Sequence, residues 1–115
     1  MERARRLRKG TEFDTVYQKG TVTGGPLLAL RRLPNGAACS RWGFAVGKRL
    51  WKRAVTRNRI KRRLKEAVRS LPVVPGFDFV VTARAGAGEA SFQDLRAALA
   101  KLLRRAHALV MEGRE

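Results

Sequence analysis

The stretch AVTRNRIKRRLKE, from Ala54 to Glu66, carries six basic side chains and reaches an acid only at its last residue. Its apolar residues recur at the spacing of an α-helix and continue beyond the quoted stretch, as Ile60, Leu64, Ala67, Val68 and Leu71. An apolar stripe of this kind predicts a helix that buries one face against another layer, most simply a sheet.

The opposite face of this predicted helix is polar and almost free of acids. It carries Asn58, Arg62, Lys65 and Arg69, with Arg59 and Lys61 on its flanks. A solvated face usually mixes signs, because like charges four residues apart destabilise a helix by roughly 0.2–0.5 kcal/mol each. Binding to the phosphates of a nucleic acid explains the absence of acids better than simple exposure to solvent does. Asn58 can both donate a hydrogen bond to a sugar hydroxyl or base edge and accept one from it. We interpret this face as phosphate-binding, with an ordinary solvated face as the alternative.

The composition of the whole chain favours a polyanionic partner. Residues 1–115 form a single predicted domain with 26 Lys and Arg against nine Asp and Glu, a formal charge of +17. This charge does not distinguish RNA from DNA or from an anionic membrane surface. No apolar run approaches ~20 residues, so we expect a cytoplasmic protein with no membrane association. Cys39 is the only cysteine, which excludes an internal disulfide and a cysteine-based zinc site.

The remaining elements complete a small α+β sandwich of a mainly antiparallel sheet with helices. They are predicted at residues 11–20 (helix), 26–33 and 41–47 (an antiparallel strand pair), 77–83 (strand) and 91–110 (helix). Thr11 is the expected N-cap of the first helix, and Ser91, with Asp94 three residues on, that of the last. The order is helix, two or three strands, basic helix, strand, helix.

No residue suggests that this chain is a catalyst by itself. The only histidine, His107, falls in the predicted last helix without a cysteine or carboxylate at ligand spacing. The nine acids form no evident pair for general acid–base work or for a metal. We therefore expect no catalytic residue and no metal or cofactor bound by the protein alone.

The quoted stretch resembles the arginine-asparagine-arginine signature helix of bacterial ribonuclease P protein subunits. The resemblance extends in order along nearly the whole chain, through LRKGTEFDTVYQKG, RWGFAVGKR, DFVVTAR and the amphipathic last helix. It implies a left-handed βαβ crossover, an exception to the usual hand. It also implies one protein per catalytic RNA, in an endoribonuclease that removes the 5′ leader of precursor tRNA, with the chemistry carried by Mg²⁺ bound mainly to the RNA.

The resemblance also assigns roles to residues. Binding of the catalytic RNA falls to Arg57, Asn58, Arg59, Lys61, Arg62, Arg63 and Lys65. Binding of the leader and substrate falls to Phe13, Tyr17, Lys48, Arg49 and Arg84. Further candidates are Arg8, Lys9, Arg31, Lys52 and Arg53. For Phe13 and Tyr17, packing in the core is the alternative that their positions alone favour.

The chain departs from the family pattern at two places. The link LWKR, residues 50–53, is one residue longer than usual, with Trp51 where glycine is common. Arg31 stands where some members carry a leader-facing tyrosine, although a guanidinium can also stack on a base.

Two other classes of protein share this charge and size. A structural RNA-binding protein of the ribosomal type fits the composition equally well and is the main alternative. A DNA-binding or nucleoid protein would need a helix-turn-helix or a dimerising surface, and the sequence contains neither clearly.

Overall fold

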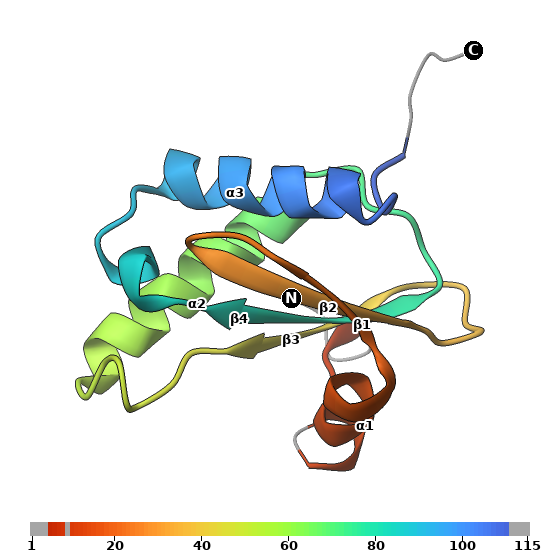
Figure 1. The fold of residues 1–115 in the computed structure, drawn as a ribbon, viewed down its shortest axis with the longest axis horizontal. Helices are drawn as coiled ribbons and strands as arrows, with labels where there is room; N and C mark the ends of the chain where they lie inside the picture. The colour runs from red at the N-terminus through yellow and green to blue at the C-terminus, as the bar shows by residue number, and fades with distance from the viewer. Residues whose placement is uncertain (1–4, 9, 111–115) are drawn as a thin grey trace.

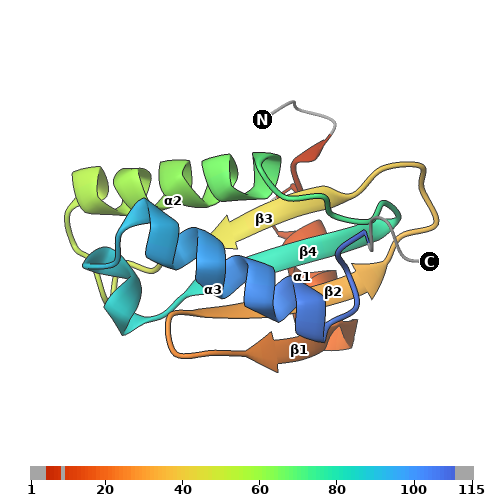
Figure 2. The same ribbon diagram turned by 90° about the horizontal axis from the view of Figure 1, so that it is seen from above.

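The computed structural model describes residues 5–8 and 10–110 and has the expected α+β architecture (Figure 1). Its elements are α1 (Thr11–Lys19), β1 (Thr21–Gly24), β2 (Leu28–Pro34), β3 (Arg41–Ala45), α2 (Ala54–Arg69), β4 (Phe77–Ala83), the 3₁₀ turn η2 (Ala85–Gly88) and α3 (Phe92–Arg105). Helices α2 and α3 cover one face of the sheet, and α1 lies on the other (Figures 1 and 2). The polypeptide therefore forms three layers around one sheet.

The sheet has the strand order β1-β2-β4-β3. Strand β2 pairs antiparallel with both β1 and β4, whereas β3 runs parallel to β4. The antiparallel pair predicted between residues 26–33 and 41–47 is therefore wrong, because β4 lies between these two strands. The reason is burial: Phe79, Val80 and Val81 are all fully buried, so β4 has apolar neighbours on both faces and takes a central position. The parallel strands β3 and β4 are joined through α2, which makes a βαβ unit.

The larger core lies between the sheet and the helices α2 and α3. It contains Leu28, Leu30, Phe79, Val81, Ile60, Leu64, Leu95, Leu99 and Leu103, all 0–1% exposed. The predicted stripe of α2 is confirmed at Ile60, Leu64, Ala67 and Val68, while Leu71 follows the end of the helix and is half-buried. A smaller cluster of Leu7, Val16 and Val80 holds α1 on the opposite face. Burial of the α2 stripe directs its basic face away from the core.

The ends of the helices differ from the sequence prediction in two places. Thr11 is the first residue of α1, and the N-cap is Gly10, whose φ of 86° suits glycine and which offers no side-chain cap. Ser91 and Asp94 form the predicted capping box of α3. That helix ends at Arg105, however, and the chain reverses at His107 (φ 57°), so that Leu109 bridges to Val73. His107 and residues 109–110 therefore lie outside the helix in which they were predicted.

Candidate nucleic-acid interface

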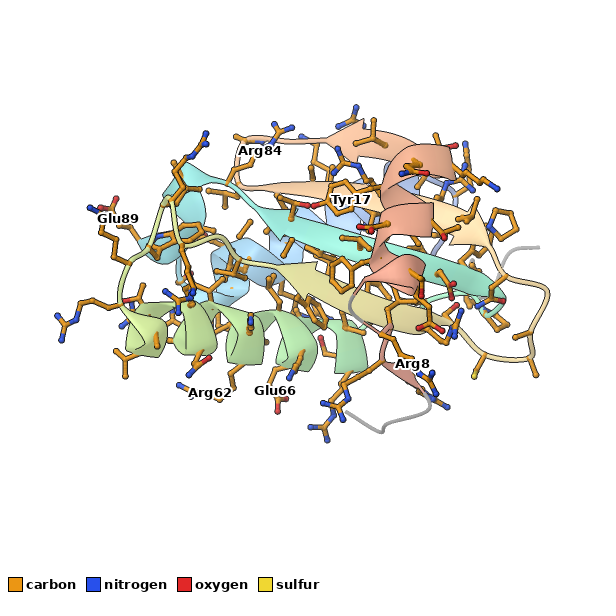
Figure 3. All side chains as sticks on the ribbon, turned by 90° about the horizontal axis from the view of Figure 1, so that it is seen from below. Arg8, Tyr17, Arg62, Glu66, Arg84 and Glu89 are labelled. Atoms are coloured by element: carbon orange, nitrogen blue, oxygen red, sulfur yellow. The ribbon has the colours of Figure 1, made fainter. Side chains whose placement is uncertain are left out.

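The solvent-facing side of α2 is cationic over its whole length. Asn58, Arg62 and Arg69 are exposed, whereas Lys65 on the same face and the flanking Arg59 and Lys61 are half-buried. Arg69 pairs with Glu66 at 3.2 Å, and Figure 3 shows Arg62 and Glu66 pointing away from the body of the protein. The first turn of α2 contains no acid, so the positive end of the helix dipole adds to the charge of the side chains. This face therefore attracts anions.

Two of the arginines predicted to bind the catalytic RNA donate hydrogen bonds to the protein's own backbone. Arg57 donates from Nη1 to the carbonyl oxygens of Trp51 and Lys52, both at 2.9 Å. Arg63 donates from Nη1 to the carbonyl oxygen of Ala90, also at 2.9 Å. Arg57 thus holds the loop before α2, and Arg63 holds the link between η2 and α3. The sequence analysis did not predict this role.

The loop before α2 extends the cationic face. Lys48, Arg49, Lys52 and Arg53 are all exposed there. The loop is closed by a hydrogen bond from the Trp51 N–H to the Gly47 carbonyl at 3.2 Å. Four cations within six residues thus lie beside the positive N-terminus of the helix. We call residues 47–53 the basic loop.

A hollow of about 730 Å³ lies between α1, β3 and α2. Its lining combines aromatic rings with cations and includes Phe13, Phe44, Arg8, Lys61 and Lys65. The structure therefore brings together predicted leader-binding and RNA-binding residues that are far apart in the sequence. The Phe13 ring also packs on the backbone of Gly43, where an added Cβ would come within 2.5 Å of it. Phe13 consequently contributes to the core as well as to the hollow.

Tyr17 contacts a different part of the sheet. Its side chain is 39% exposed, its hydroxyl lies 2.8 Å from Thr82 Oγ1, and the Arg31 guanidinium carbon lies 4.2 Å from the ring centroid. Figure 3 shows the ring pointing from α1 across the sheet. The resemblance assigns both Phe13 and Tyr17 to the leader, and of these two residues Phe13 lines the hollow whereas Tyr17 does not. Tyr17 and Arg31 instead make a separate cation–π surface on the same face of the sheet.

Other predicted site residues are spread around this face. Arg84 donates from Nη1 to the Gly25 carbonyl at 2.7 Å. Arg105, which was not a predicted site residue, donates to the neighbouring Gly24 carbonyl at 3.1 Å. Part of the Arg84 guanidinium thus holds the turn between β1 and β2. Arg8 is exposed at the hollow, and Lys9 lies outside the described residues.

A buried ionic network, which the sequence analysis missed, ties α1 to the sheet. Asp78 is 6% exposed and accepts from Arg41 Nε at 2.9 Å, from Arg41 Nη2 at 2.7 Å and from Asn35 Nδ2 at 2.8 Å. The third nitrogen, Arg41 Nη1, donates to Glu12 of α1 at 2.9 Å. These hydrogen bonds to Asp78, with further attraction from both carboxylates, raise the pKa of Arg41 above its usual range, against an opposing effect of burial. The network fixes one wall of the hollow.

The described part of the chain holds no cluster of three or more His, Cys, Asp or Glu side chains arranged for a metal ion. Within the same residues, no helix has the length and apolar character needed to cross a membrane.

The chain is thus a small basic α+β protein in which a cationic crossover helix of a βαβ unit lies beside an aromatic hollow. The model of the ribonuclease P family matches residues 1–107 of this chain. The chain belongs to the family of ribonuclease P protein components.

Individual relatives agree with this assignment. The ribonuclease P protein component of Roseiflexus castenholzii is 44% identical over 109 residues, which cover 92% of this chain and 88% of the relative. That of Xanthomonas campestris pv. campestris is 41% identical over 108 residues, covering 93% and 72%. Among structures, the RNase P protein of Staphylococcus aureus superimposes with a TM-score of 0.83 at 27% identity, covering 94% of this chain and 100% of that one. The RNase P protein of Thermotoga maritima gives 0.80 at 29% identity, covering 87% and 96%.

Proposed function

We propose that this chain acts as the protein component of ribonuclease P. In that role it binds the catalytic RNA and the single-stranded 5′ leader of precursor tRNA, one protein per RNA, in the cytoplasm. The chemistry falls to the RNA and its Mg²⁺ ions, and the protein supplies binding and orientation. Support comes from the family membership of the chain and from the arrangement of its cations.

The observation that carries the proposal is the continuity of the cationic surface. The basic loop joins the exposed face of α2 without an acidic residue between Lys48 and Lys65. Each cation that faces a phosphate releases condensed counterions, so such a surface favours the backbone of a folded RNA. Asn58 lies exposed on this face and supplies an acceptor that arginine and lysine lack.

The leader needs a different surface, because a single strand is bound by stacking as well as by charge. The hollow between α1, β3 and α2 offers Phe13 and Phe44 beside Lys61 and Lys65. Tyr17, with Arg31 over its ring, adds a second stacking platform on the same face of the sheet. Stacking on an aromatic ring tolerates any base, so we expect little sequence preference for the leader.

The proposal is tested by comparing precursor and mature tRNA in the reconstituted complex. The catalytic RNA of a ribonuclease P is assembled with this chain, and dissociation constants are measured for tRNA with and without a leader of several nucleotides. The expected result is tighter binding of the precursor only when the protein is present. Equal affinity for both tRNAs would contradict the leader role, and incorporation into a ribosomal subunit would favour the ribosomal-type alternative.

A further inference from the structure

The indole of Trp51 packs closely against Gly88 of η2. Trp51 itself stands where the family pattern commonly has glycine. A Cβ added at Gly88 would come 2.4 Å from Trp51 Nε1, 3.2 Å from Cε2 and 3.3 Å from Cδ1. Real Cβ atoms essentially never approach another heavy atom to less than 3.0 Å. The backbone of Gly88 does not itself require glycine, because its φ is not positive. The absence of a side chain at Gly88 is thus required by the space that the indole fills.

The main chain around Trp51 is held at further points. The Trp51 N–H donates to the Gly47 carbonyl, and Arg57 Nη1 donates to the carbonyls of Trp51 and Lys52. The indole itself is half-buried against the main core. The basic loop is therefore closed by a hydrogen bond of its own and held by contacts of Trp51 and Lys52 with η2 and α2.

This fixation matters because of what the loop carries. Lys48, Arg49, Lys52 and Arg53 are exposed and of one sign, so they repel one another and favour a spread, mobile loop. A mobile loop would lose conformational entropy when it binds RNA, and this loss would reduce the affinity. A loop that is already ordered in the free protein avoids the loss.

From this geometry we propose that Trp51 and Gly88 form a lock that pre-organises the basic loop for RNA. Trp51 is a positioning residue in this account: it acts through the four cations and does not itself contact the RNA. The inference rests on the proposed function, since it concerns how the same cationic surface binds the catalytic RNA and its substrate.

The test displaces the indole without changing any charge. Gly88→Ala introduces a methyl group that clashes with the indole, while residue 51 remains a tryptophan. Gly25→Ala is the matched control, because its Cβ would meet Leu102 Cδ2 at an ordinary 3.5 Å. Trp51→Phe in the Gly88→Ala background removes the clashing pyrrole ring and should restore the packing. Binding to ribonuclease P RNA in complex with precursor tRNA is measured over a series of salt concentrations, together with tryptophan fluorescence and thermal unfolding.

For Gly88→Ala we expect red-shifted emission, because the only other tryptophan, Trp42, is buried. We expect binding to weaken about tenfold, with the log–log salt slope unchanged because every cation remains. The double variant Trp51→Phe/Gly88→Ala should recover most of this loss, and Gly25→Ala should bind as the original protein does. By contrast, Lys48→Ala/Arg49→Ala should reduce the slope itself.

Three results would overturn the lock. The first is unchanged emission in Gly88→Ala, which would mean that the indole does not occupy the space over residue 88. The second is a shifted emission in Gly88→Ala with unchanged RNA affinity. Trp51 would then only shield the core from water, and the proposed function would remain intact. The third is a double variant that stays as weak as Gly88→Ala. If the original protein itself fails to bind the RNA, the proposed function fails, and the lock fails with it.

Discussion

Replacement of Arg41 by methionine should destabilise the protein more than any change on the exposed cationic face. Methionine keeps the unbranched apolar part of the side chain but removes both hydrogen bonds from Arg41 to the buried carboxylate of Asp78, at 2.9 and 2.7 Å. Asn35 then remains as the donor to Asp78. Hydrogen bonds to charged groups are each worth roughly 1.5–3 kcal/mol.

The expected loss is smaller than the sum of two such bonds, because the Arg41 side chain is 32% exposed and water can enter. We therefore expect the free energy of unfolding to fall by about 2–4 kcal/mol. The measurement is urea denaturation at neutral pH. Arg49→Met is the matched control, and a substitution on the exposed loop should change stability by no more than about 0.5 kcal/mol.

Two further results check the cause. Asp78→Asn in the Arg41→Met background removes the uncompensated charge and should restore part of the loss. The pKa of Arg41 is raised on folding, so its stabilising contribution is complete below the pKa of the unfolded state and is lost only as the pH rises beyond it. The difference between the two proteins should thus stay constant from neutral pH to about pH 10. A loss below about 1 kcal/mol, or one that fades across this range, would refute the reasoning.

Three predictions concern RNA. Arg59→Ala/Arg62→Ala should weaken binding of the catalytic RNA and lower the log–log salt slope by up to about 0.9 per lost phosphate contact; an unchanged slope would remove these residues from the interface. Asn58→Lys adds charge but removes an acceptor, so a directed contact predicts weakening by about 1–3 kcal/mol, and tighter binding would exclude one. Tyr17→Ala should weaken binding of precursor tRNA by about 1–3 kcal/mol with little effect on mature tRNA, whereas equal loss for both, or an unfolded variant, would return Tyr17 to the core.

Local patterns predicted most of the elements. The α2 stripe, the strand Phe77–Ala83 and the Ser91–Asp94 capping box all depend on residues within a few positions of one another, and all three are confirmed. The end of α3 was missed for the converse reason. Leu109 keeps the helical spacing of apolar residues, but it is packed beside Val73 after the chain has turned back.

Contacts between segments that are far apart in the sequence could not be predicted from local patterns. The position of β4 between β2 and β3 depends on pairings between residues 37 to 55 positions apart, and a hairpin was the simpler local alternative. Arg41 and Asp78 are 37 residues apart, and neither lies in a recognisable motif. The basic residues of α2 were identified correctly as a cluster. The sequence could not reveal, however, that Arg57 and Arg63 donate to backbone carbonyls.

The most direct test of the proposed function is cleavage of precursor tRNA at low Mg²⁺ concentration. The catalytic RNA of a ribonuclease P is incubated with precursor tRNA, with and without this chain, under conditions in which the RNA alone is nearly inactive. We expect the protein to restore cleavage at the 5′ leader junction, because its cations offset phosphate repulsion that Mg²⁺ would otherwise have to screen. Absence of any stimulation by a folded protein that binds the RNA would contradict the account.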